Sequence, residues 1–144
     1  MINGLLELIL VMSYTAWILS SATTEAILYS GQGSKAFKWN EHVVYTINRL
    51  STLMMVVSAT LLHDKLLTIN GVVMLISLVS IYPFFHDGQY YETRKQIDTP
   101  SYNFKSSSQT STAWIELNWP KRLTLFIIGV ILPITYKLSI IYIK

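Results

Sequence analysis

A set of polar side chains able to bind an ion, a proton or an anionic group lies in or beside the long apolar runs of this chain. The set combines carboxylates, imidazoles, guanidinium groups and one amide: Glu25, Glu41, His42, Asn48, Arg49, His86, Asp87, Arg94 and Arg122. A buried polar group without a partner costs about 1–3 kcal/mol, so a purely structural bundle needs few of them. We therefore predict a binding site, and its arginines favour an anion or a lipid headgroup as the occupant.

Arg49 is expected to be the deepest of these charges. It lies about two turns beyond His42, or about 10 Å at 1.5 Å per residue. A guanidinium and a carboxylate form the strongest ion pair, and Glu25 is expected at a similar depth. We predict that Arg49 contacts Glu25, or failing that Asp87. Two interpretations stay open: a buried pair that fixes how two helices pack, or a site for an ion, a proton or an anionic substrate.

A metal site is a sharper alternative at the same membrane face. His42 and His86, with Glu25, Glu41 or Asp87, supply the nitrogen and carboxylate ligands that Zn²⁺, Mn²⁺ or Fe accept. No pair of these residues has the spacing H-x-x-x-H or E-x-x-H that marks a metal-binding helix. We therefore expect no cofactor, and a metal at His42 and His86 remains the alternative.

Catalytic chemistry has little support in the sequence. The chain has no Cys, which excludes thiolate nucleophiles and disulfides, and no G-x-S-x-G nucleophile elbow. Residues 86–94 are dense in hydrogen-bonding groups, and Arg94 could hold a lipid phosphate there with His86 as a base. Polar groups that cap a helix end explain this segment more simply. The sequence leaves enzymatic activity undecided and favours a protein without it.

Four apolar runs must position these groups, and they lie near residues 5–28, 43–62, 66–85 and 123–143. Each is close to the roughly 20 residues that an α-helix needs to cross a hydrocarbon core about 30 Å thick. Backbone groups in lipid must bond within their own segment, so each run is expected to be helical. We predict an all-α integral membrane protein, with a four-transmembrane-helix bundle as a single domain over 1–144.

The longest connection is expected between the third and fourth helices, over residues 87–121. Loops longer than about 12–15 residues without secondary structure are uncommon unless they are functional or disordered. We expect an ordered polar loop here, packed on the membrane surface, on helix ends or on a neighbouring subunit. Pro83 is expected to bend or close the last turn of the third helix, and Pro133 to kink the fourth.

The basic residues indicate an orientation. Residues 29–41 and 87–121 share one membrane face, which we name side A. Both termini and the turn at 63–65 share the opposite face, side B. Most of the 11 Lys and Arg residues lie on side A, which favours the cytoplasm for that side and a non-cytoplasmic location for both termini. Anionic lipid headgroups explain the pI near 9.1, so we expect no nucleic-acid partner.

Three functions remain open. The first is an oligomeric membrane protein that forms an ion, proton or small-solute pathway, with a polar vestibule on side A. The second is an accessory or assembly subunit of a larger membrane complex, and the third is an enzyme acting on a lipid headgroup. The third and fourth runs have no charged residue near their middle, which counts against a pathway. Nothing in the sequence opposes a subunit. The expected partners are the lipid bilayer and either further copies of the chain or other membrane subunits.

Overall fold

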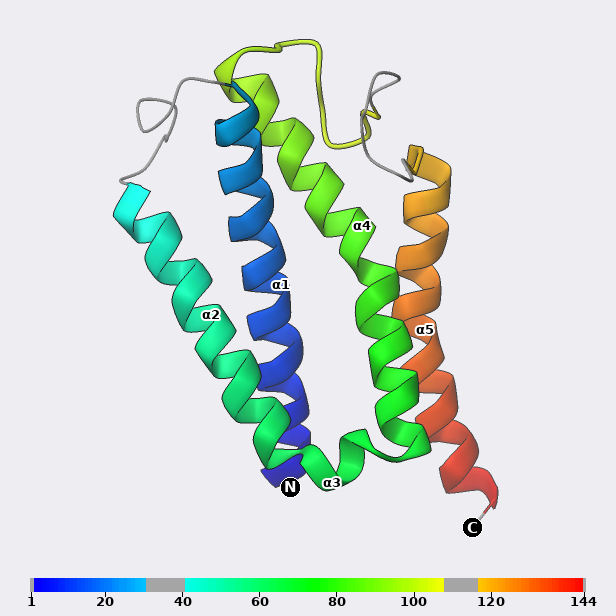
Figure 1. Ribbon diagram of the computed structural model, residues 1–144. Helices are drawn as coiled ribbons and strands as arrows, with labels where there is room; N and C mark the ends of the chain where they lie inside the picture. Colours follow the sequence, from blue (N-terminus) through cyan, green and yellow to red (C-terminus); the bar gives the residue numbers. More distant parts are fainter. Residues whose placement is uncertain (1, 31–40, 108–116, 144) are drawn as a thin grey trace.

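The computed structural model describes residues 2–30, 41–107 and 117–143, and these segments form helices joined by turns, with no strand among them (Figure 1). The helices are α1 (Ile2–Ser30), α2 (Glu41–Leu61), the single-turn α3 (His63–Leu66), α4 (Ile69–Ile97) and α5 (Trp119–Ile143). Both termini lie at the same end of the molecule as α3, as expected for side B (Figure 1).

Three of these helices are long and apolar enough to cross a membrane. They cover Gly4–Ser30 in α1, Ile69–Ile97 in α4 and Trp119–Tyr142 in α5. Helix α2 has 21 residues but is not among the three, because polar residues, including Asn48 and Arg49, lower its hydropathy. The membrane-protein prediction is thus supported by three helices, and the fourth span is not confirmed.

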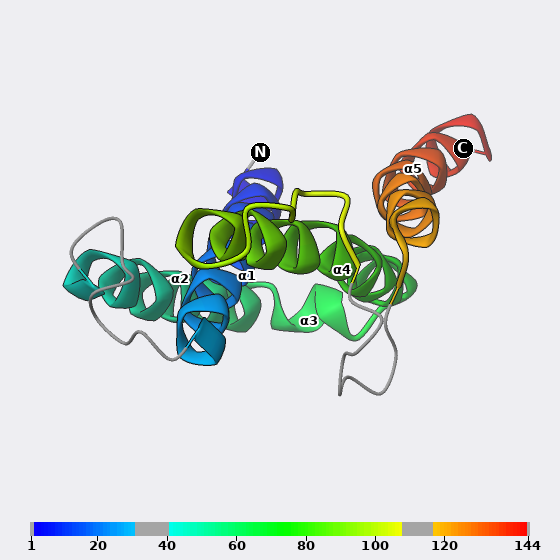
Figure 2. The ribbon, with the colours of Figure 1, turned by 90° about the horizontal axis from the view of Figure 1, so that it is seen from above.

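The four long helices form an open row. Helix α1 packs between α2 and α4, and α5 packs on α4. Viewed from above, the order across the row is α2, α1, α4 and α5 (Figure 2). Only 6% of the apolar span of α5 is buried, so most of its surface faces outward. The expected bundle is therefore not closed within the described part of the chain.

Small residues bring neighbouring helices close together. Between α4 and α5, a Cβ built on Gly129 would lie 2.7 Å from Cγ2 of Ile81 and 2.9 Å from the carbonyl oxygen of Ser77. On α2, the small residues Ser51 and Ser58 are buried, whereas most of the apolar residues of this helix are exposed. Small residues at helix contacts are typical of membrane proteins, because the apolar effect that drives packing in water is absent in lipid.

Helix α4 is longer than expected. Its predicted end near residue 85 is wrong: the helix continues through Pro83 to Ile97, so the following connection starts at residue 98 instead of 87. Proline is tolerated in membrane helices because neighbouring groups can satisfy the freed carbonyl. Beyond residue 85 the helix is stabilised by side chains four residues apart, in the pairs Gln89–Thr93, Tyr90–Arg94 and Arg94–Asp98.

The first part of the connection between α4 and α5 folds back onto α4. The Phe104 ring lies directly on Gly88, where an added Cβ would overlap the ring. The same ring contacts Phe84 and Trp119, at centroid distances of 5.2 and 6.0 Å. The expected packing of this loop on helix ends is found over 98–107, whereas residues 108–116 lie outside the described part.

Candidate functional site

The most concentrated polar contact joins α1 to α4 near side A. Oε2 of Glu25 on α1 lies 3.0 Å from Nε2 of His86 on α4, and the other ring nitrogen, Nδ1, lies 3.3 Å from Oδ1 of Asp87. The His86 side chain is 13% exposed and that of Glu25 is 44% exposed, so the contact is reachable from one side. We name Glu25, His86 and Asp87 the His86 cluster.

An aromatic ring fixes the plane of the imidazole. Tyr82 lies one turn earlier on α4, and its ring stacks on His86 with centroids 4.8 Å apart and planes 16° from parallel. Tyr82 in turn contacts Trp17 of α1, at 6.5 Å between centroids. One face of the imidazole is therefore covered, and its two nitrogens are directed at carboxylates.

This geometry has a consequence for protons. A neutral imidazole carries one N–H, so it can donate to only one carboxylate. Both nitrogens of His86 donate only when the ring is an imidazolium, and a neutral ring satisfies both contacts only when one carboxyl is protonated. The arrangement therefore offers a ring N–H a carboxylate on either side, one from α1 and one from α4.

Three further hydrogen bonds hold α1 against its neighbours. Nε2 of Gln89 donates to Oγ1 of Thr23 at 3.0 Å, about one turn beyond His86. On the other side of α1, Nδ2 of Asn48 donates to Oγ of Ser20 and of Ser21, at 3.1 and 2.8 Å. Asn48 thus lies at the contact between α2 and α1.

The predicted ion pair between Arg49 and Glu25 is not formed. Arg49 is an exposed residue of α2, and no carboxylate of the described residues lies within ion-pair distance of it. Successive residues on a helix are about 100° apart, so Asn48 and Arg49 cannot both face α1. Asn48 takes the inner position, and Glu25 lies on the part of α1 that faces α4.

Arg94 and Arg122 lie in two separate places. Arg94 binds both carboxylate oxygens of Asp98 at 2.9 Å and donates to the Tyr90 hydroxyl at 3.0 Å. The hydrogen bond from Arg94 lowers the pKa of Asp98 below its usual 3.8. These contacts stabilise the end of α4, and the residues that sequence reasoning placed around one vestibule are divided among several sites.

Arg122 is fully buried. Its Nη2 donates to the carbonyl oxygens of Ser106 and Phe104, at 2.7 and 3.3 Å. Its guanidinium carbon lies 5.9 Å from the Tyr91 ring centroid and 5.8 Å from that of Trp119. Arg122 therefore holds the segment 98–107 against α4 and α5. Its position at the start of a helix gave no sign of this structural role.

A metal at His42 and His86 stays a prediction. Within the described segments, no group of three or more His, Cys, Asp or Glu side chains is arranged to hold a metal ion. Glu41 and His42 lie in the first turn of α2, but their side chains fall outside the described part. The contribution of these two residues therefore stays a prediction.

Sequence reasoning missed Tyr82, Gln89 and Thr23. For the two residues on α4, Tyr82 and Gln89, the signal is a spacing of three or four residues along the helix, which places them with His86 and Thr93 on the side toward α1. It is visible only when α4 is recognised as continuing past Phe85. No protein-family model, no curated protein and no solved structure matches the chain.

Proposed function

We propose that this protein is an integral membrane protein that carries protons through the His86 cluster, as part of a pathway across the bilayer. The observation that carries this proposal is that each imidazole nitrogen of His86 faces a carboxylate, one of them from a second helix. Histidine changes charge near physiological pH and serves widely as a proton shuttle. The cluster lies at a helix contact within two membrane-length helices, where ionisable residues are rare and mostly functional.

We propose α2 as a fourth span. Its 21 residues give a length of about 31 Å, close to the hydrocarbon thickness of about 30 Å. It runs beside α1 over much of its length (Figure 1). Asn48 finds its hydrogen-bond partners on α1, which supports its burial at a helix contact. The polar residues of α2 are then accommodated by α1 or, like Arg49, lie toward the side A end.

A pathway needs neighbouring copies, because the helices of one chain form an open row. The outward apolar surface of α5 supports oligomerisation, and a closed ring of chains would place the α1–α4 contact beside a shared axis or beside the next chain. The same surface also favours the second candidate function, an accessory subunit whose α5 packs on a different membrane protein.

The test is proton flux in liposomes. The purified full chain is reconstituted with a pH-sensitive dye inside, and a proton gradient is imposed across the bilayer. Wild-type protein should dissipate the gradient, and His86→Gln should slow this at least about tenfold, as expected for loss of a positioned proton carrier.

His63→Gln is the matched control. His63 also lies beside an aspartate in the chain, with Nδ1 3.2 Å from Oδ1 of Asp64, but its side chain is 69% exposed at side B. This variant should conduct as wild type. Flux equal to that of empty liposomes, or equal flux in wild type and His86→Gln, would overturn the proposal. Recovery of the chain only together with a different membrane protein would favour the subunit.

A further inference from the structure

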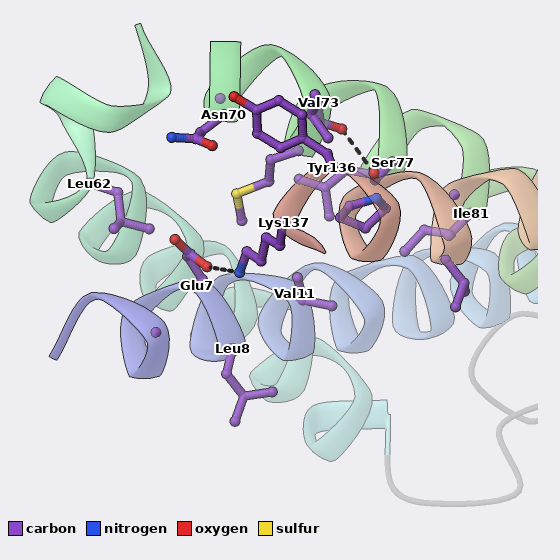
Figure 3. Close-up of a pocket in the computed structure, with 17 residues that line it drawn as sticks. Glu7, Leu8, Val11, Leu62, Asn70, Val73, Ser77, Ile81, Tyr136 and Lys137 are labelled. Atoms are coloured by element: carbon purple, nitrogen blue, oxygen red, sulfur yellow. Dashed lines mark hydrogen bonds and ion pairs between the residues drawn. The ribbon is translucent and has the colours of Figure 1, made fainter. Parts of the chain in front are cut away.

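A cavity of about 530 Å³ lies between α1, α4 and α5 toward side B (Figure 3). Its deep part is lined by apolar side chains, among them Leu78, Ile81 and Val130. Its outer part holds Glu7 of α1 and Lys137 of α5, which face each other (Figure 3). This volume is within the roughly 300–1,000 Å³ of typical small-molecule sites.

The depth of the cavity equals about one leaflet of a bilayer. Its lining extends along α4 from Asn70, at the side B start of that span, to Ile81. At 1.5 Å per residue this is about 16 Å, roughly half of a hydrocarbon core of about 30 Å. The cavity therefore begins where headgroups lie and ends near the middle of the membrane.

The apolar lining argues against water as the occupant. A buried water needs about two to four polar partners, and apolar cavities stay dry or bind apolar molecules. Helices α1 and α5 both pack on α4 but make little contact with each other, so the cavity lies in the wedge between them. In a bilayer, the molecule that reaches such a wedge is an acyl chain.

The charges at the mouth indicate the headgroup. Nζ of Lys137 lies 2.7 Å from Oε2 of Glu7, and the two side chains are 64% and 29% exposed. A lysine ammonium can bind a phosphate, and a carboxylate can accept hydrogen bonds from a primary ammonium. Two opposite charges side by side therefore match a headgroup that carries both a phosphate and an ammonium.

We propose that this cavity binds one acyl chain of a zwitterionic phospholipid from the side B leaflet, with its phosphate at Lys137 and its ammonium at Glu7. The bound lipid completes the contact between α1 and α5. This site is independent of the His86 cluster, which lies toward side A, so His86→Gln should bind the lipid as wild type does.

The test uses the full chain in lipid discs made from equal amounts of phosphatidylethanolamine and phosphatidylglycerol, followed by native mass spectrometry of the retained lipid. Wild-type protein should retain one phospholipid, with phosphatidylethanolamine enriched about threefold over the disc composition, the preference expected from one exposed charge contact. Retention of no lipid, or of lipid in the proportions of the disc, would overturn the proposal.

Filling the cavity should remove the lipid. A Cβ at Gly4 meets nothing within 4 Å, so Gly4→Phe can place its ring into the space without disturbing the helix contacts. This variant should lose most of the bound lipid. Leu5→Phe is the matched control, because Leu5 is 58% exposed and lies outside the cavity lining. Equal lipid retention by these two variants would contradict the proposal.

Charge variants test the headgroup separately. Glu7→Gln should lose the preference for phosphatidylethanolamine and retain more phosphatidylglycerol, because the ammonium no longer has a carboxylate partner. Lys137→Gln should reduce the retention of both lipids by about threefold, because the phosphate loses its cation. An unchanged composition and amount of retained lipid in both variants would show that the mouth charges do not select the headgroup.

Discussion

Helices α1 and α4 are in direct side-chain contact near side A, whereas near side B they border a cavity. Near side A, polar and aromatic side chains connect the helices directly, through the His86 cluster and the hydrogen bond from Gln89 to Thr23. Near side B, α1, α4 and α5 enclose a cavity with an ion pair at its mouth. One pair of helices is therefore joined by polar contacts at one end and borders a cavity at the other.

The segment 98–107 adds further contacts to the side A end. It covers the final turns of α4 and is fastened by the buried Arg122 and by the contact of Phe104 with Gly88. At side B the connection between α2 and α4 is short, and Leu67 within it is 77% exposed. The side A end is therefore expected to tolerate substitution poorly and the side B end well.

The largest expected effect is a difference in labelling: a reagent applied outside the cell should reach one end of the molecule and not the other. We expect a cysteine at Ser107 to lie in the cytoplasm and a cysteine at Leu67 to lie outside, because most Lys and Arg residues are on side A. The chain has no natural Cys, so each variant carries a single reactive thiol. An impermeant maleimide applied to intact cells should label only the second variant, and labelling of Ser107→Cys instead would reverse the orientation.

The next largest effect is expected at Arg122. Arg122→Ala removes a buried cation from two carbonyl acceptors and two aromatic rings, so the unfolding free energy should fall by about 2–4 kcal/mol. Steric-trapping measurements in bicelles give this quantity. Lys121→Ala is the control: the neighbouring residue is exposed, so its replacement should change stability by less than about 0.5 kcal/mol. Equal losses in the two variants would contradict the structural role of Arg122.

A pair of glycine variants compares the two ends directly. Gly88→Ala forces Phe104 away from α4, since the new Cβ would overlap its ring, and should lower the unfolding free energy by about 1–3 kcal/mol. Gly4→Ala meets open space and should stabilise α1 by about 0.5–1 kcal/mol through its higher helix propensity. Changes in unfolding free energy of opposite sign in the same assay would support a difference between the two ends, and changes of the same sign would contradict it.

Much of the architecture follows from the sequence, but the pairing of side chains does not. Three of the four predicted apolar runs correspond to helices long and apolar enough to cross a membrane, and the alternation of ends placed Glu25, His86 and Asp87 on the same side. The prediction that Glu25 pairs with Arg49 was wrong, because the rotation of α2 about its axis turns Asn48 toward α1 and Arg49 away from it. The length of α4 was missed because Pro83 resembles a helix end, although in a membrane the helix continues through it.

The open row was also not predictable from apolar runs. A run indicates that a helix enters lipid, but it does not say which helices touch. Gly129 gives a partial signal, because a residue without a side chain permits the close approach that α4 and α5 make there. The contact of α1 with α4, which builds the His86 cluster, depends on residues far apart in the chain, and one sequence carries no direct sign of it.

The smallest predicted effect concerns acid and the end of α4. Asp98 lies just beyond the span, and the hydrogen bond from Arg94 lowers its pKa below 3.8. A carboxyl whose pKa is lower in the folded protein stabilises the fold above the pKa of the unfolded chain, and it loses this contribution as the pH falls through the folded value. Wild-type protein should therefore exceed Asp98→Asn in stability by up to about 1 kcal/mol at pH 6, and the difference should shrink near pH 3.

The Arg94–Asp98 contact can be separated from a general acid effect with a double variant. Arg94→Gln should remove the same increment at pH 6, and the variant with both substitutions should lose less than the sum of the two single variants, because they break one shared contact. Unfolding of all four proteins in the same bicelles at both pH values gives the coupling. A difference between wild type and Asp98→Asn that stays constant from pH 6 to pH 3 would show that this pair does not stabilise the end of α4. The stability of the side A end would then depend on the contacts of Arg122 and of the His86 cluster.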